Sequence, residues 1–208
     1  GNRPNSDRRW IHRCCPYLQP NHQPVSRTVK PFVSRRFVGS FLAIALVVVA
    51  LDQGIKIWVL ASLSPQVSYP FFGELLKLYL TFNDSAAFSI GFGATWIFTI
   101  LSSLAVLALL WFGPKVKTRG WAILAGVLLG GVTGNLIDRL TRAPGFPSGQ
   151  VVDYLQIPLN FPIFNLADIC IVTSTCLAAL AIIRGQSIGG SKPADAPADA
   201  PTDAPADN

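Results

Sequence analysis

Four long apolar runs dominate the sequence and restrict what the chain can fold into. They cover residues 37–63, 94–112, 121–137 and 163–183. Each run is close to the ~20 residues that a helix needs to cross a bilayer. Half of the 208 residues are hydrophobic, and the runs are apolar nearly all round, whereas a soluble bundle shows apolar stripes between charged faces. The sequence therefore predicts an all-α membrane protein with four transmembrane helices.

The placement of the positive charges predicts how these helices are oriented. Of the seventeen lysines and arginines, eight precede the first run, three lie in the turn at 113–120 and two follow the fourth run. Cytoplasmic segments of membrane proteins are enriched in these residues. We therefore expect both termini in the cytoplasm and the loops 64–93 and 138–162 on the extracytoplasmic side. A net charge of +6 also fits nucleic-acid binding, but the topology explains the same charges, so we expect no nucleic-acid partner.

The two ends of the chain differ in composition from its apolar centre. Residues 1–36 are basic and without periodicity, and residues 185–208 carry a Pro-Ala-Asp repeat that cannot bury a core. We expect a disordered cytoplasmic arm at 1–36, a four-helix membrane domain at 37–184 and an acidic low-complexity cytoplasmic tail at 185–208. The histidines and cysteines lack metal-ligand spacing, so we expect no metal and no cofactor.

The two outer loops favour different structures. The segment LLKLYLTF at 75–82 combines alternation with β-forming residues, which predicts a small sheet or hairpin at the outer leaflet. The second outer loop contains several prolines, which oppose a continuous helix. They are Pro144, Pro147, Pro158 and Pro162.

Charged and amide side chains gather at the outer side of the predicted bundle. In the first run Asp52 and Lys56 are four residues apart, so they share a helix face and can pair. Charged residues within a membrane are costly and mark an ion pair, a transport pathway or a catalytic site. The predicted topology places the following residues on one side: Asp52, Lys56, Asn83, Asn135, Asp138, Arg139, Asp153, Asn165 and Asp168.

Asp153 and Asp168 lie in one stretch, VVDYLQIPLNFPIFNLAD at 151–168, and Asp168 lies at the start of the fourth run. Two carboxylates in a poorly solvated site share a proton, which is the basis of acid–base hydrolysis. Spacing alone does not favour Asp153 over Asp138 for this role. Asp138 also fits a purely structural role as the counter-ion of Arg139 at a helix end, and Asp52 with Lys56 fits a structural ion pair.

Five motifs, in order along the chain, resemble the lipoprotein signal peptidase (signal peptidase II) family. They are LDQ-x-x-K-x-W from Leu51, N-x-x-x-A-F-S from Asn83, GG-x-x-GN-x-x-DR from Gly130, VVD from Val151 and FPIFN-x-AD from Phe161. The resemblance implies an aspartic endopeptidase of the bacterial cell membrane with its active site at the extracytoplasmic face. Such an enzyme removes signal peptides from diacylglyceryl-modified prolipoproteins by cleaving before the lipidated cysteine.

Carried onto these motifs, the resemblance implies that Asp153 and Asp168 are the catalytic pair. It further implies that other motif residues line the site, hold the substrate or support the fold. They are Asn83, Asn135, Arg139, Asn165, Asp52, Lys56 and Asp138. We expect a monomer whose partners are lipid-modified prolipoproteins and membrane lipids. Ser85 stands where the family commonly has glycine, which puts the conformation of that turn in question.

Functions of other classes use the same residue types. A small proton- or cation-coupled transporter also places Asp and Lys within a membrane, but the sequence shows neither an inverted repeat nor a broken span. A Ser–Lys peptidase needs a serine in a matching motif, and none is present. A subunit that only scaffolds partners would leave the outer aspartates without a purpose.

Overall fold

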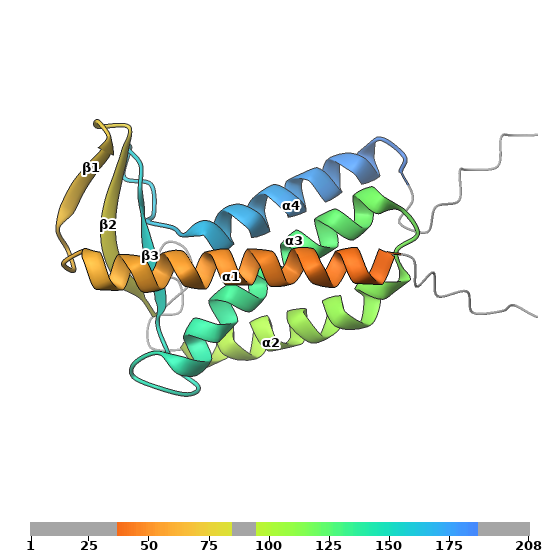
Figure 1. The fold of residues 1–208 in the computed structure, drawn as a ribbon, viewed down its shortest axis with the longest axis horizontal. Helices are drawn as coiled ribbons and strands as arrows, with labels where there is room; N and C mark the ends of the chain where they lie inside the picture. Colours follow the sequence, from red (N-terminus) through yellow and green to blue (C-terminus); the bar gives the residue numbers. More distant parts are fainter. Residues whose placement is uncertain (1–36, 85–94, 187–208) are drawn as a thin grey trace, which may run out of the picture. The chain divides into compact units, whose positions relative to one another are not determined.

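The four predicted spans are helices in the computed structural model, which describes residues 37–84 and 95–186 (Figure 1). Their bounds are α1 Val38–Ser62, α2 Thr95–Phe112, α3 Arg119–Thr141 and α4 Leu166–Ile183. Each is long and apolar enough to cross a membrane, and a helix satisfies its own backbone polar groups there. The prediction of a four-span membrane protein is confirmed. Helix α3 extends beyond the predicted run because its polar last turns find partners inside the bundle.

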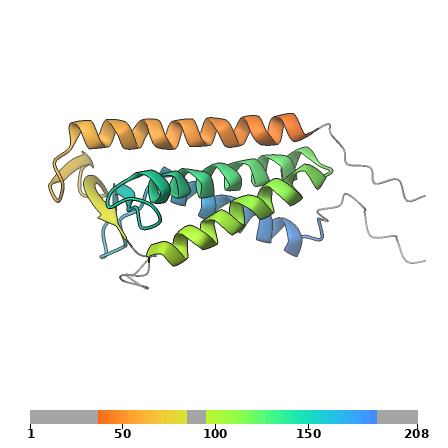
Figure 2. The ribbon, with the colours of Figure 1, turned by 90° about the horizontal axis from the view of Figure 1, so that it is seen from below.

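Helix α3 packs against the other three helices (Figure 2). Its glycines allow this close approach, as small residues commonly do between membrane helices. A Cβ added at Gly130 would lie 2.5 Å from Val48 Cβ on α1, and one at Gly131 would lie 2.7 Å from the Ala167 carbonyl oxygen on α4. At Gly134 the nearest atom would be Asp52 Oδ2, at 2.5 Å. The glycine ridge therefore brings a charged residue of α1 directly onto α3.

The loops at one end of the bundle form a three-stranded antiparallel sheet in the order β1-β2-β3. Its strands are β1 Ser68–Phe72, β2 Leu76–Asn83 and β3 Val151–Gln156. The first two form the hairpin that the sequence predicted. The second loop supplies β3, which the proline-rich sequence did not lead us to expect. Asp153 thus lies in a strand opposite Thr81.

A small apolar core fixes this sheet to the bundle. Val59, near the end of α1, packs in one buried cluster with Leu80 of β2 and with Val152 and Tyr154 of β3. The Tyr154 hydroxyl also accepts a hydrogen bond from the Leu166 N–H at 3.3 Å. Strand β3 is therefore held between the end of α1 and the start of α4, which sets the position of Asp153.

Candidate active site

A cavity of about 970 Å³ lies at the sheet end of the bundle, within the size range of small-molecule and peptide side-chain sites. Its wall comes from β2, β3, α3, the first turns of α4 and the loop at 157–164. Five of the residues singled out in the sequence line it: Asn83, Asn135, Arg139, Asp153 and Asp168. Residues from four elements thus converge on one space.

Asp153 is 1% exposed and is held by an amide on each carboxylate oxygen. Its Oδ2 accepts a hydrogen bond from Asn83 Nδ2 at 2.8 Å, and its Oδ1 accepts one from Asn165 Nδ2 at 2.6 Å. Asn83 pairs with Val151 across the sheet, and residues two apart on a strand share a face. The strand register therefore brings Asn83 to Asp153.

Asp168 lies in the first turn of α4 and closes a capping box with Asn165. Asn165 Oδ1 accepts from the Asp168 N–H at 3.0 Å, and Asp168 Oδ2 accepts from the Asn165 N–H at 3.1 Å. The other oxygen, Oδ1, accepts a hydrogen bond from Asn135 Nδ2 of α3 at 2.8 Å. The capping box and Asn135 together fix the carboxylate at the helix N-terminus, where negative charge is favoured.

Two amides connect the two carboxylates. Asn165 Nδ2 donates to Asp153 and, at 3.1 Å, to Asn135 Oδ1, while Asn135 donates to Asp168. Burial first, and then the nearby charge of Asp168, raise the pKa of Asp153 to about 7, against hydrogen bonds from Asn83 and Asn165 that lower it. The Asp153 carboxyl can therefore carry a proton near neutral pH.

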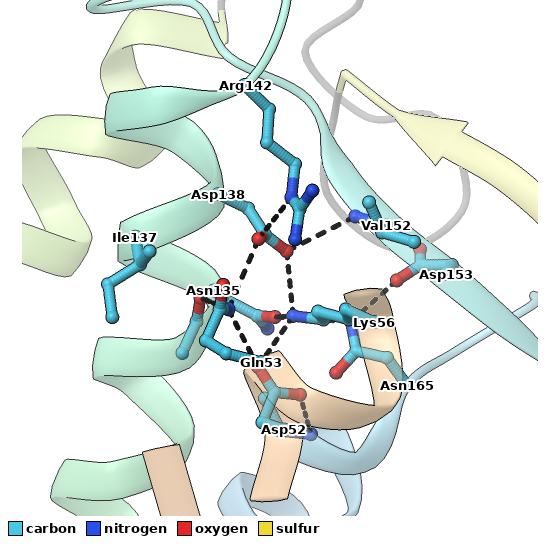
Figure 3. A network of polar contacts seen from close by, with 12 residues as sticks. Asp52, Gln53, Lys56, Asn135, Ile137, Asp138, Arg142, Val152, Asp153 and Asn165 are labelled. Atoms are coloured by element: carbon cyan, nitrogen blue, oxygen red, sulfur yellow. Dashed lines mark hydrogen bonds and ion pairs between the residues drawn. The ribbon is translucent and has the colours of Figure 1, made fainter. Parts of the chain in front are cut away.

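A buried ionic cluster, shown in Figure 3, contacts the cavity wall through Asn135. Lys56 Nζ lies 2.9 Å from Asp52 Oδ2 and 2.7 Å from Asp138 Oδ2, and all three side chains are fully buried. The predicted pairing of Asp52 with Lys56 is confirmed. Lys56 Nζ also donates to Asn135 Oδ1 at 3.0 Å, so the cluster connects directly to the amide that holds Asp168.

The two carboxylates of this cluster also bind the backbone beside each cavity aspartate. Asp52 Oδ1 accepts from the N–H of Ala167 at 3.1 Å, and Asp138 Oδ2 accepts from the N–H of Val152 at 3.3 Å. Ala167 and Val152 immediately precede Asp168 and Asp153. Each cavity aspartate is thus tied, through its preceding residue, to a buried carboxylate on another element.

The structure separates the candidate residues into two groups. The cavity wall contains Arg139, whose guanidinium lies 5.3 Å from the centre of the Phe98 ring. Asp52, Lys56 and Asp138 belong to the buried cluster, and Asn165 is buried between the cluster and Asp153. Ser85, whose effect the sequence left open, lies outside the described residues.

Sequence reasoning missed two members of the cluster, Gln53 and Arg142. Gln53 Nε2 donates to Asp52 Oδ2, Asp138 Oδ1 and the Gly134 carbonyl oxygen. Arg142 contacts Asp138 through Nε. Gln53 stands inside the LDQ motif, and Arg142 follows Asp138 by four residues, a spacing that allows a helical ion pair. The motif position was sufficient to include Gln53 among the candidates, and the spacing was sufficient to include Arg142.

A four-span membrane bundle in which two aspartates line one cavity is the arrangement expected of a membrane-embedded aspartic peptidase. The family model described as Signal peptidase (SPase) II matches residues 44–184. The chain belongs to the signal peptidase II family of aspartic peptidases.

Two relatives illustrate this membership, and one solved structure shares the fold. The chain is 43% identical to the lipoprotein signal peptidase of Leifsonia xyli subsp. xyli over 79% of its own length and 78% of the relative's. It is 34% identical to the lipoprotein signal peptidase of Mycobacterium avium, over 83% of this chain and 96% of that one. A solved bacterial membrane enzyme superposes with a TM-score of 0.65 at 28% identity, over 73% of this chain and 92% of that chain.

Proposed function

We propose that Asp153 and Asp168 are the catalytic pair with which this chain removes signal peptides from diacylglyceryl-modified bacterial prolipoproteins, cutting before the lipidated cysteine. The observation that carries the proposal is the convergence of the two aspartates on one cavity, where the pKa of Asp153 is raised to about 7. The relatives named lipoprotein signal peptidase support the substrate class.

In the proposed mechanism the pair holds one proton. Buried carboxylates close together cannot both ionise cheaply, so they titrate as a unit. Asp168 is the ionised member, because it caps a helix N-terminus, and Asp153 is the protonated one. Asp168 takes a proton from water, whose oxygen attacks the scissile carbonyl carbon, and Asp153 donates its proton to the carbonyl oxygen. The proton on Asp168 then passes to the leaving amine as the C–N bond breaks, and one hydroxyl of the intermediate returns its proton to Asp153. This leaves a carboxylic acid and restores the single proton of the pair.

The remaining wall residues divide into polar and apolar groups. Asn83, Asn135 and Arg139 offer N–H donors for the backbone carbonyls of a bound peptide. Ile169 and Val172 of α4 continue the cavity as an apolar wall, and both are exposed enough, at 41% and 61%, to face lipid. The acyl chains of the substrate therefore stay in the bilayer while the peptide enters the cavity.

The orientation of the chain is also a proposal. Within the described residues, all carboxylates belong to the half of the bundle that holds the sheet, whereas Lys115, Lys117, Arg119 and Arg184 lie near the opposite helix ends. Lys and Arg favour the cytoplasmic side, so we place the cavity at the extracytoplasmic face and both termini in the cytoplasm. Residues 37–184 form the peptidase domain and act as a monomer, with 1–36 and 185–208 as cytoplasmic extensions.

Cleavage of a defined substrate tests the proposed function. The purified chain in lipid nanodiscs is expected to cleave a diacylglyceryl-modified prolipoprotein before its cysteine, with no effect of chelators or serine reagents. The same prolipoprotein without the lipid is the matched control and is expected to stay intact. Mass spectrometry of both products locates the cleaved bond. Equal cleavage of the two forms, or cleavage at another bond, would contradict the proposal.

The raised pKa of Asp153 predicts the pH dependence of the reaction. Below about pH 7 the pair keeps its single proton, and above it the last proton is lost, so kcat is expected to fall as pH rises through about 7. Asp168 opposes this loss by its negative charge, while Lys56 favours it by its positive charge. Initial rates at saturating substrate between about pH 5.5 and 9 measure the effect. A kcat that is constant across this range, or that rises with pH, would contradict the shared proton.

A further inference from the structure

The buried cluster around Lys56 carries excess negative charge until Arg142 is included. Asp52 and Asp138 are fully buried, and the single ammonium of Lys56 lies between them. A buried charge without a counter-ion is costly, particularly within a membrane. Arg142, at the end of α3, contacts Asp138 through Nε, and its side chain is only 19% exposed. With Arg142 the cluster has two negative and two positive charges.

Arg142 also completes the set of donors to the Asp138 carboxylate (Figure 3). Oδ1 accepts from Gln53 and Arg142, while Oδ2 accepts from Lys56 and from the Val152 N–H. An ionised carboxylate has about four acceptor sites, so these donors occupy the group fully and fix its orientation. The bond to Val152 is the one that leads to the cavity, because Asp153 is the next residue.

The loop between α3 and β3 starts at Arg142, and its last residues hydrogen-bond to the backbone at the end of α3. The Gln150 N–H donates to the Ala143 carbonyl oxygen at 3.0 Å, and the Gly149 N–H donates to the Arg139 carbonyl oxygen at 3.1 Å. The loop is therefore closed at its base, directly before β3. A rotation of the Asp138 carboxylate would act on the Val152 amide and, through one peptide unit, on Asp153.

We propose that Arg142 is a positioning residue for peptide hydrolysis, which holds the Asp138 carboxylate in the orientation that fixes Val152 and thereby sets Asp153 opposite Asp168. The proposal rests on the proposed assignment of Asp153 to the catalytic pair. Arg142 is not part of the cavity wall, so it acts on kcat and not on substrate binding. It thus differs from Arg139, three residues earlier, which lines the cavity.

The experiment compares Arg142→Gln and Arg142→Lys with the wild-type chain in nanodiscs, using the diacylglyceryl-modified prolipoprotein. A displacement of a reacting group by about 1 Å can cost up to about 100-fold in rate. We expect R142Q to lower kcat by about tenfold or more with KM changed by less than about twofold, and R142K to recover part of kcat because it keeps the charge. The matched control is Lys77→Gln, which removes a partly exposed, ion-paired cation from the sheet and is expected to keep wild-type kcat.

Two further comparisons separate positioning from a general loss of folded protein. If Arg142 acts through Asp138, adding R142Q to Asp138→Asn is expected to lower kcat by less than about a further twofold. The effects of residues that contact each other and act through the same interaction are not additive. In Asp52→Asn the cluster loses one negative charge, so D52N/R142Q keeps one charge of each sign, on Asp138 and Lys56, and is expected to fold. Its kcat is expected to stay about tenfold or more below that of D52N alone.

Specific outcomes overturn the proposal. They are wild-type kcat in R142Q, a rise in KM with unchanged kcat, effects of R142Q and D138N that multiply, and equal kcat in D52N and D52N/R142Q. A fall in kcat fully accounted for by the folded fraction, measured by size-exclusion chromatography and thermal unfolding, also overturns it. An active Asp153→Asn variant refutes the catalytic pair itself, whereas an inactive D153N beside a fully active R142Q refutes only the role of Arg142.

Discussion

Asp153→Asn and Asp168→Asn are each expected to lower kcat for prolipoprotein cleavage by roughly 10²- to 10⁴-fold, while the protein still inserts and folds. Asparagine keeps the size of the side chain but neither takes a proton from water nor donates one to the scissile carbonyl, and acid–base catalysis contributes about this factor. The two variants differ in the hydrogen bonds that the substituted side chain makes. D153N places an amide beside the Asn83 and Asn165 amides, whereas D168N alters the capping box of α4.

The double variant D153N/D168N shows whether the two aspartates act as one unit. Groups that work together in one catalytic step are strongly non-additive, so the double variant is expected to be about as inactive as either single one. Glu74→Gln is the matched control, because it removes a carboxylate that is 85% exposed in the turn between β1 and β2. Full activity in either single variant, measured by the rate of signal-peptide release, would refute the assignment.

The helices, and the gathering of polar residues at one end of the bundle, were predictable because both depend on signals that are local in the sequence. Apolar length alone predicts a span, and the spacing of Asp52 and Lys56 alone predicts that they can pair. The positive charges predict one orientation, and this orientation gathers the polar residues at one end. The capping box between Asn165 and Asp168 is local too, since a short polar residue three positions before an acidic one indicates a helix start.

The partners of each polar side chain depend on contacts between distant segments. The second loop forms β3 because Val59 of α1 and Leu80 of β2 provide a buried surface for Val152, and its prolines gave no sign of that. The position of Asp138 in the buried cluster follows from the approach of α1 to the α3 glycines. Its contact with Lys56 therefore required the packed bundle, whereas the i, i+4 spacing to Arg142 was visible in the sequence.

Lys56→Met is expected to have the largest effect on stability. The substitution conserves the unbranched shape of the side chain but removes the ammonium that lies 2.9 Å from Asp52 and 2.7 Å from Asp138. Removing one partner of a buried ion pair leaves a charge without compensation, which costs ~3–5 kcal/mol. Here two fully buried carboxylates lose their common partner, and Arg142 offsets only the charge of Asp138. We expect the free energy of unfolding in mixed detergent micelles to fall by about this amount.

Two comparisons decide whether uncompensated charge is the cause. Lys77→Met removes the same ammonium from an ion pair whose partners are 29% and 85% exposed, and exposed pairs contribute only ~0–1 kcal/mol. In the double variant Asp52→Asn/Lys56→Met, one negative charge leaves together with the positive one, so the remaining charges of Asp138 and Arg142 balance. Part of the lost stability is then expected to return, although the bond to Ala167 is weakened. If K56M costs no more than K77M, or if the double variant is less stable than K56M, the fold does not depend on charge balance in this cluster.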